Sequence, residues 1–278
     1  KLIGNNVNGA QRWIYITKTL SFQPSEIVKF LVIVFYAGIL VKNRDDLPYF
    51  WKGLVKHICM VAPLIALLIL EPHFSASIVI VGIVCIMMIV AGCKFSQFVA
   101  VGGGVGIPAI VLLIVKSPYR LKRVVSFLDP WKDATDTGWQ VIQSLYAIGS
   151  GGLFGVGLGD SKQKYLYIPE PHNDFIFSII GEELGFVGCT VIIVLFAIFI
   201  WRGILIAMRA PDMFGSLVAV GITALIGIQV IINIAVVTSS MPATGMPLPF
   251  FSYGGTALFI LLCQMGVLLN ISRASTKS

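Results

Sequence analysis

Long apolar runs dominate this chain and restrict it to one class of fold. They cover roughly residues 26–42, 53–70, 75–92, 97–116, 175–201, 214–238 and 254–272. A helix needs roughly 17–25 apolar residues to cross the hydrocarbon part of a bilayer. Charged residues make up only 12% of the chain, whereas a soluble domain carries about twice that share. The sequence therefore predicts an all-α integral membrane protein, a polytopic helical bundle with about seven spans.

The connections between the runs are short except for the stretch from 117 to 174. We treat residues 1–278 as one transmembrane domain and 117–174 as its large loop. Lys and Arg near span ends mark the cytoplasmic side, and one predicted side collects Lys42, Arg44, Lys52, Lys56, Lys94, Arg202, Arg209, Arg273 and Lys277. The opposite short segments carry only Lys1, Arg12 and Lys18. We expect the loop outside, the C-terminus in the cytoplasm, and an odd number of spans before Lys1.

The first part of the long loop has the pattern of an amphipathic helix. Its apolar residues recur at the helical spacing i, i+3, i+4, i+7, with arginines on the other face: Leu121, Val124, Val125 and Leu128 against Arg120 and Arg123. A helix of this kind, basic on its polar side, lies in the membrane interface. We expect this segment to rest on the membrane surface.

Residues 138–148 repeat the amphipathic pattern, with one face made of Gln140, Gln143, Ser144 and Ala147. The following segment, 149–159, is very rich in glycine. It lacks both the G-x-G-x-x-G spacing and a following Lys-Ser/Thr, so it predicts no nucleotide loop. Separately, we expect no nucleic-acid partner for this chain. Glycine here lets the backbone approach a substrate or another helix closely.

Ionisable groups inside membrane spans are costly and are functional candidates by default. Glu26 and Lys29 stand three residues apart, which fits either a helix-start ion pair or a substrate contact by Lys29. Glu182 and Glu183 lie about two turns into a span and cannot both face lipid. We expect one of them to line an interior cavity or to bond a break in a neighbouring backbone.

Asp174 ends the long loop beside the densest titratable cluster of the chain. That cluster comprises Glu170, His172 and Asp174, with Lys162 and Lys164 nearby. An aspartate before an apolar helix is a preferred N-cap, which is one explanation of its position. The other is that a carboxylate at the outer rim of a span acts as a general base on a hydroxyl.

A last irregular stretch, 241–255, separates the final two spans and contains three prolines and three glycines. Irregular backbone at membrane depth is tolerated where protein or a watery cavity receives it. The aromatic residues Phe250, Phe251 and Tyr253 are too apolar for a simple external turn. We therefore expect a buried cavity lining that includes Pro249 and Ser252.

Together these segments resemble the SEDS family (shape, elongation, division and sporulation), which includes RodA, FtsW and SpoVE. The matching stretches run in family order along nearly the whole chain: 7–13 (VNGAQRW), 22–26 (FQPSE) with Lys29, 138–144 (GWQVIQS), 169–177 (PEPHNDFIF), 181–185 (GEELG) and 247–255 (PLPFFSYGG). Two departures are Asn173, where Thr is frequent, and 71–77 (EPHFSAS), which replaces a commoner Gln-Pro-Asp-Leu-Gly pattern. The second leaves the substrate-side role of the Glu71 region open. The departures look more like Gram-positive division or sporulation members than like enterobacterial RodA.

The resemblance implies a ten-span fold, so about three N-terminal spans are expected before residue 1. It implies a peptidoglycan glycosyltransferase that polymerises lipid II outside the cytoplasmic membrane together with a class B penicillin-binding protein, in division, elongation or sporulation. The essential external-loop aspartate of the family maps onto Asp174.

On this basis we expect an inverting glycosyl transfer in which Asp174 deprotonates the 4-hydroxyl of a lipid II GlcNAc. Cations must meet the charge on the departing diphosphate; the candidates are Arg12, Lys162, Lys164 and the group Arg120, Lys122 and Arg123, with Mg²⁺ or Mn²⁺ as a candidate cofactor. Anchoring to anionic phospholipid is an equally good role for that group. Gln140, Gln143 and Ser144 are assigned to sugar or loop hydrogen bonds, Lys29 and His172 to substrate binding, and Glu26, Glu182, Glu183, Pro249 and Ser252 to the cavity.

Two other functions stay open at this stage. A lipid II flippase would use buried Glu26, Lys29 and Glu182 with a broken helix near 241–255. A scaffold that recruits a penicillin-binding protein would need no titratable rim.

Overall fold

The computed structural model describes residues 5–7, 10–15, 21–71, 74–133, 138–163 and 173–275. Within these ranges, seven helical segments are long and apolar enough to cross a membrane: Pro24–Lys42, Phe50–Leu70, Phe74–Ala91, Phe95–Val115, Ile176–Met208, Met213–Val237 and Gly255–Ala274. They coincide with the runs expected from the sequence. The prediction of a polytopic helical bundle is confirmed.

The chain divides into two compact units. The first unit comprises Lys1–Val101, Ile200–Ile228 and Gly254–Ser278, and the second comprises Gly102–Phe199 and Gln229–Tyr253. Two helices, α8 (Ile176–Met208) and α9 (Met213–Val237), contribute residues to both units.

The first unit begins with a small antiparallel sheet that the sequence analysis did not predict. Its strands are β1 (Asn5–Val7), β2 (Ala10–Tyr15) and β3 (Ser21–Phe22), in the order β1-β2-β3. The helices follow: α1 (Pro24–Lys42), the 3₁₀ turn η1 (Arg44–Asp46), the π-helical turn η2 (Phe50–Val55), α2 (Lys56–Leu70), α3 (Phe74–Ala91), α4 (Phe95–Val101) and α10 (Gly255–Ser275).

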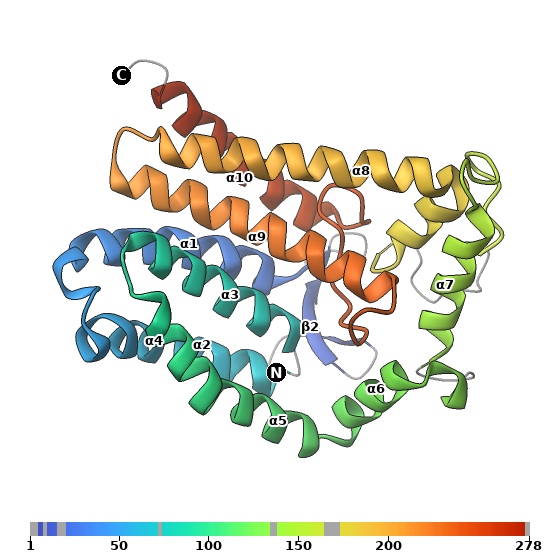
Figure 1. Ribbon diagram of the computed structural model, residues 1–278, viewed down its shortest axis with the longest axis horizontal. Coiled ribbons are helices and arrows are strands. Elements are labelled where there is room, and N and C mark those ends of the chain that lie inside the picture. The colour runs from blue at the N-terminus through green and yellow to red at the C-terminus, as the bar shows by residue number, and fades with distance from the viewer. Residues whose placement is uncertain are drawn as a thin grey trace. The chain divides into compact units, whose positions relative to one another are not determined.

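Helices α1 and α3 run side by side in the first unit (Figure 1) and enclose its core with the first part of α9. Gly221 of α9 marks a close approach, because an added Cβ would lie 2.5 Å from Ile33 and 3.0 Å from Met87. Lipid gives helices no hydrophobic reason to associate, so close packing at small residues holds such bundles together. Gly221 serves that purpose here.

The second unit carries the long loop predicted from the sequence. Its elements are the π-helical turn η3 (Gly102–Gly106), α5 (Ile107–Val115), α6 (Pro118–Leu128), the 3₁₀ turn η4 (Pro130–Asp133), α7 (Trp139–Gly151), α8 up to Phe199, and α9 from Gln229. After α9 the chain is irregular through Tyr253. The two amphipathic segments expected in the loop are the helices α6 and α7.

Helix α8 is two helices joined at a break. Gly185 has φ 66° and ψ −165°, which no helix contains, and glycine reaches this region without the steric penalty of a Cβ. The break exposes backbone groups that the helix would otherwise pair, and other backbone must pair them at membrane depth.

Candidate active site

Asp174 lies in a turn directly before α8 begins at Ile176. The flanking aromatic rings of Phe175 and Phe177 are each 3% exposed and anchor this turn in the interior. The side chain of Asp174 is half-buried. The carboxylate is therefore held by the surrounding protein and still partly accessible from outside.

Asn233 in α9 connects the Asp174 turn with the irregular segment 238–253. Its side-chain amide donates to the backbone carbonyl of Asp174 at 2.8 Å and to that of Met246 at 2.7 Å. The residue is 1% exposed; its bond to Met246 is buried, and its bond to Asp174 is partly buried. The Asn233 side chain thereby holds the Asp174 turn and the segment around Met246 at a fixed distance, although neither belongs to a helix.

Ser252 makes a second connection between the same two stretches. Its hydroxyl donates to the carbonyl of Asn173 at 2.5 Å and accepts from the backbone N–H of Leu248 at 2.7 Å. Leu248 is 1% exposed and Pro249 is buried. This part of the irregular segment therefore belongs to the core of the second unit.

Gly245 faces the carboxylate itself. Its φ is +65°, and an added Cβ would lie 3.1 Å from Oδ2 of Asp174. A side chain here would be strained by the backbone angle and would press on the carboxylate. The turn at Gly245 therefore leaves room beside Asp174.

The aromatic residues of the irregular segment pack against α8. Phe250 meets Phe199, and Phe251 meets Phe196, with 6.0 Å between ring centroids in each pair. These rings remain 40% and 42% exposed, and Tyr253 is 82% exposed. The segment thus has a buried part around Leu248 and an exposed aromatic rim, and the expected cavity lining by Pro249 and Ser252 stays a prediction.

The glycine-rich segment after α7 fills the break in α8. Gly152 and Leu153 accept hydrogen bonds from the N–H groups of Phe186 and Val187, at 2.9 and 3.1 Å. In return, Val156 donates to the carbonyl of Glu182 at 3.0 Å, and Gly157 donates to that of Glu183 at 3.1 Å. We call this arrangement of residues 151–163 on residues 181–187 the glycine clasp.

Two glycines make the clasp possible. A Cβ at Gly151 would clash with the carbonyl of Gly181, and one at Gly155 would clash with that of Glu183. Of the two purposes considered for this glycine density, close approach to another helix is the one that the structure displays.

The buried side chain of Glu182 binds the last residues of the clasp. The residue is 3% exposed. Its carboxylate accepts from the hydroxyl of Ser161, from the backbone N–H of Lys162 at 3.1 Å and from that of Gln163 at 3.3 Å. Donors of this kind are what a buried carboxylate requires. The side chain of Glu183 is half-buried.

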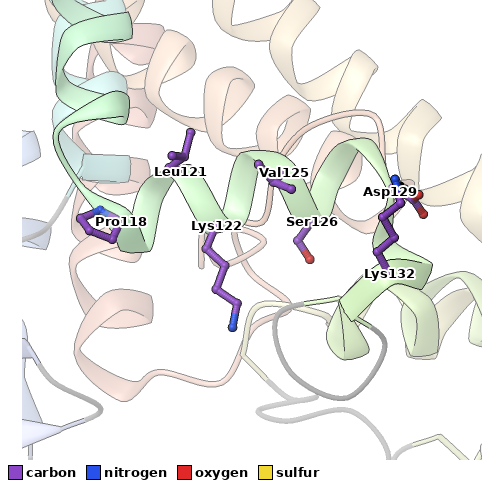
Figure 2. A pocket seen from close by; sticks show the side chains of 7 residues that line it. All are labelled: Pro118, Leu121, Lys122, Val125, Ser126, Asp129 and Lys132. Carbon is purple, nitrogen blue, oxygen red and sulfur yellow. Dashed lines mark ion pairs between the residues drawn. The ribbon is translucent and has the colours of Figure 1, made fainter.

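Helix α6 borders an open pocket of about 350 Å³ in the second unit (Figure 2). In Figure 2, Lys122 and Ser126 point to one side of α6, and Leu121 points to the other. Lys132 of η4 lines the same pocket and pairs with Asp129 at 3.1 Å. The pocket combines apolar walls with two lysines.

The orientation of α6 differs from the sequence-based expectation at Arg123. Arg123 was grouped with Arg120 and Lys122 as a cation for diphosphate or lipid, but its guanidinium is partly buried and donates to the carbonyl of Ala243 at 2.7 Å. The irregular segment needs donors because it has no helical bonds of its own. The periodicity of α6 could not reveal a partner that is distant in sequence.

Helix α7 also turns its polar face inward. Gln143 is 7% exposed and Ser144 is 0% exposed, and the hydroxyl of Ser144 donates to the carbonyl of Val237 at 2.8 Å. This bond reaches the last residue of α9, and the expected sugar or loop hydrogen bonds of Ser144 stay a prediction. Gln140 is half-exposed.

In the first unit, Glu26 and Lys29 form an ion pair of 2.7 Å in α1, and the Lys29 side chain is 3% exposed. Burial makes this pair interdependent, because removing one partner leaves an uncompensated charge.

Some predicted site residues fall outside what the structure describes. Lys164, Glu170 and His172 lie outside the described residues, and Arg12 and Arg120 are described by their backbone in β2 and α6 alone. Within the described ranges, no three His, Cys, Asp or Glu side chains are grouped to hold a metal ion. The expected Mg²⁺ or Mn²⁺ stays a prediction.

Seven candidate spans in the described ranges, with the polar turn at Asp174 directly before one of them, place the chain among polytopic membrane proteins. The sequence matches the cell cycle protein family of FtsW, RodA and SpoVE over residues 1–277. The chain belongs to this family.

Individual relatives agree with this assignment. Stage V sporulation protein E of Bacillus subtilis (strain 168) is 47% identical over 98% of this chain and 74% of its own length. A probable peptidoglycan glycosyltransferase FtsW of Trichlorobacter lovleyi is 45% identical over 97% of this chain and 70% of its own length.

Solved structures are similar as well. A chain from a structure titled as a peptidoglycan synthase complex that coordinates polymerization and crosslinking gives a TM-score of 0.79 at 29% identity, covering 100% of this chain and 77% of that chain. Rod shape determining protein RodA of Thermus thermophilus gives 0.69 at 28% identity, covering 98% and 72%. The fold expected from the sequence is that of these membrane proteins.

Proposed function

We propose that the chain is a peptidoglycan glycosyltransferase that polymerises lipid II into glycan strands at the outer face of the cytoplasmic membrane. Relatives that are 43% and 45% identical are named as probable peptidoglycan glycosyltransferases. The observation that carries the site assignment is the half-buried carboxylate of Asp174, held by Asn233 and Ser252 through the surrounding backbone and facing a side-chain-free Gly245.

Asp174 acts as the general base in this proposal. Its carboxylate takes the proton from the 4-hydroxyl of the acceptor GlcNAc while that oxygen attacks C1 of the donor sugar. The bond from C1 to the diphosphate breaks, and the new bond has the β-1,4 configuration. A positioned base of this kind contributes roughly 10²–10⁴ in rate.

Charge grows on the departing diphosphate and needs positive groups close to it. Lys162 is exposed, and Glu182 holds its backbone N–H within the glycine clasp. Lys122 and Lys132 line the pocket on α6, whose apolar walls suit the lipid that carries the diphosphate. Arg123 uses one of the five N–H donors of its guanidinium for the carbonyl of Ala243, and its contribution to diphosphate binding stays a prediction.

The proposed orientation puts the long loop outside and the C-terminus in the cytoplasm, as the Lys and Arg near the span ends indicate. The proposed partner is a class B penicillin-binding protein. The synthase complex that contains a similar chain is titled as coordinating polymerization with crosslinking.

Purified full-length protein with its partner penicillin-binding protein and labelled lipid II, without another polymerase, tests the proposal. A glycosyltransferase produces glycan strands, and Asp174→Asn abolishes them. A flippase would move lipid II between the leaflets of liposomes irrespective of Asp174. A scaffold would do neither while it still binds its partner. Either of these two results would exclude the proposed function.

The metal requirement is proposed separately. Mg²⁺ or Mn²⁺ would assist by neutralising diphosphate charge. Strand formation would then stop in EDTA and return when either ion is added, and full activity in EDTA would remove the metal from the proposal.

A further inference from the structure

The tip of the glycine clasp carries large apolar side chains that are exposed in the part of the chain that the structure describes. Leu153 is 64% exposed, Phe154 80%, Val156 46% and Leu158 78%. Soluble surfaces rarely gather apolar side chains this closely without an interaction partner. Polar residues resume directly afterwards at Asp160 and Lys162, which are exposed.

The depth of this tip follows from its hydrogen bonds to α8. Residues 152–157 bond to residues 182–187, so the two stretches lie at the same level. From Phe186 to Trp201 the helix has no charged residue, and this length rises about 24 Å. Because the hydrocarbon core is about 30 Å thick, a helix entering it near Arg202 has its break about 5 Å inside the opposite boundary. Tilting the helix would put the break deeper.

The backbone groups of the tip are hydrogen-bonded, as a position inside the hydrocarbon core requires. Irregular chain survives within hydrocarbon when protein pairs its N–H and C=O groups. The four bonds to α8 do this, and Gly155 adds a bond to the carbonyl of Gly151 at 2.7 Å. The apolar side chains of the tip are exposed, while its backbone bonds to the helix break.

The exposed surface of the tip continues onto α8. Phe186 is 66% exposed and Val187 is 45% exposed, and both bond directly to the tip residues Gly152 and Leu153. Trp131 and Tyr146, 60% and 51% exposed, stack edge to face at 5.9 Å elsewhere in the unit. Such aromatic residues favour the headgroup level of a membrane.

We propose that Leu153, Phe154, Val156 and Leu158 insert into the acyl chains of the leaflet opposite the Arg202 end. This lipid contact fixes the height of the clasp and keeps Lys162 at the level of the phosphate groups. Elements bound in this way bury their apolar side about 5–10 Å into the boundary between headgroups and acyl chains, which agrees with the depth of the α8 break. That this leaflet is the outer one rests on the orientation proposed above.

Spin-label accessibility in nanodiscs tests the proposal. The full-length protein, without its partner, is prepared with Ala or Ser at its native cysteines and embedded in phosphatidylethanolamine and phosphatidylglycerol. A nitroxide is attached to Phe154→Cys or, as the matched control in the same loop, to Asp160→Cys. A melting temperature equal to that of the wild-type protein verifies the fold of the cysteine-free parent.

The expected result is that the label at 154 collides more with oxygen than with a water-soluble nickel complex, and that the label at 160 shows the reverse. Leu158→Cys provides an independent second position if Phe154→Cys does not fold. Preferential collision with nickel at both 154 and 158 overturns the proposal. If the labels collide with nickel in the protein alone and adding the penicillin-binding protein shields them from nickel, that protein covers the tip in place of lipid, and the proposal fails.

Discussion

At the scale of single residues, Asp174 is placed by neighbours that carry no charge. Asn233 and Ser252 bond to the backbone of residues 173–174, and Gly245 leaves space beside the carboxylate. A general base must lie within hydrogen-bond reach of its proton. These three residues control that geometry without taking part in the chemistry.

Asn233→Ala tests this positioning role. The variant leaves the buried carbonyls of Asp174 and Met246 without their donor, which costs about 1–3 kcal/mol per buried unpaired group. We expect a lower melting temperature and a lower kcat for polymerisation at an unchanged KM for lipid II. Thr238→Ala, which removes an exposed hydroxyl bonded to Ile234 in the last turn of α9 and to Ser240, serves as the control. An unchanged kcat together with a lower melting temperature would show that Asn233 stabilises the fold and does not position Asp174 for catalysis.

Gly245→Ala probes the space beside the carboxylate. The left-handed backbone angle costs a residue with a Cβ about 1–2 kcal/mol, and the new methyl group lies 3.1 Å from Oδ2 of Asp174. We expect strand synthesis to fall with little loss of lipid II binding. Gly149→Ala in α7 meets no atom within 4 Å and should retain activity. Equal rates for both variants would show that this spacing is unimportant.

The site role of Asp174 was easier to predict from the sequence than the roles of Asn233 and Gly245. Asp174 is prominent in the sequence because a carboxylate at the rim of a span needs an explanation. Asn233 lies in an apolar helix and Gly245 is one of 28 glycines. Their roles depend on a contact between segments far apart in the chain. The asparagine at mid-helix in an apolar run is a signal that a search for buried polar residues would have found, together with Gln229 in the same helix.

At the scale of elements, the broken helix α8 and the glycine clasp are a single unit. Neither could keep its backbone groups paired without the other, because the break at Gly185 leaves bonds open that the clasp completes. The sequence indicated close approach through glycine density and a bonded glutamate in the span. It could not specify that these two features meet each other.

Glu182→Gln tests whether the carboxylate holds the clasp. An amide has one acceptor oxygen and an NH₂ group that would face the donors from residues 161–163. Loss of charge-assisted bonds of about 1.5–3 kcal/mol each should accelerate amide hydrogen exchange at Lys162 and Gln163 on the order of tenfold or more. Asp160→Asn provides the control at an exposed position. Protection that stays at the wild-type level would mean that the backbone bonds suffice.

Helix α6 shows what sequence periodicity predicts, an apolar face left open for lipid, and what it omits, the partner of Arg123. The apolar residues Leu121, Val125 and Leu128 are exposed, whereas Arg123 turns toward Ala243. In a soluble protein the apolar face would be the buried one. At a membrane surface this order is reversed, since lipid receives apolar residues and protein supplies the partners for an arginine.

At the scale of the whole molecule, the spans were predictable because hydrophobic length alone determines them. The small N-terminal sheet was not, since its strands are short and depend on pairing between segments. The division into two units was equally hidden, because it passes through α8 and α9. Hydropathy reports which segments lie in lipid, and it carries no information about which of them pack together.

The rate of glycan strand formation by Asp174→Asn, measured beside Asp160→Asn in the complete protein with its partner, tests the central claim most directly. Asparagine keeps the shape of the side chain but cannot accept the proton of the sugar hydroxyl. We predict a loss of at least about a hundredfold with undiminished binding of labelled lipid II, while Asp160→Asn polymerises at the wild-type rate. A rate for Asp174→Asn within a few-fold of wild type would contradict the account.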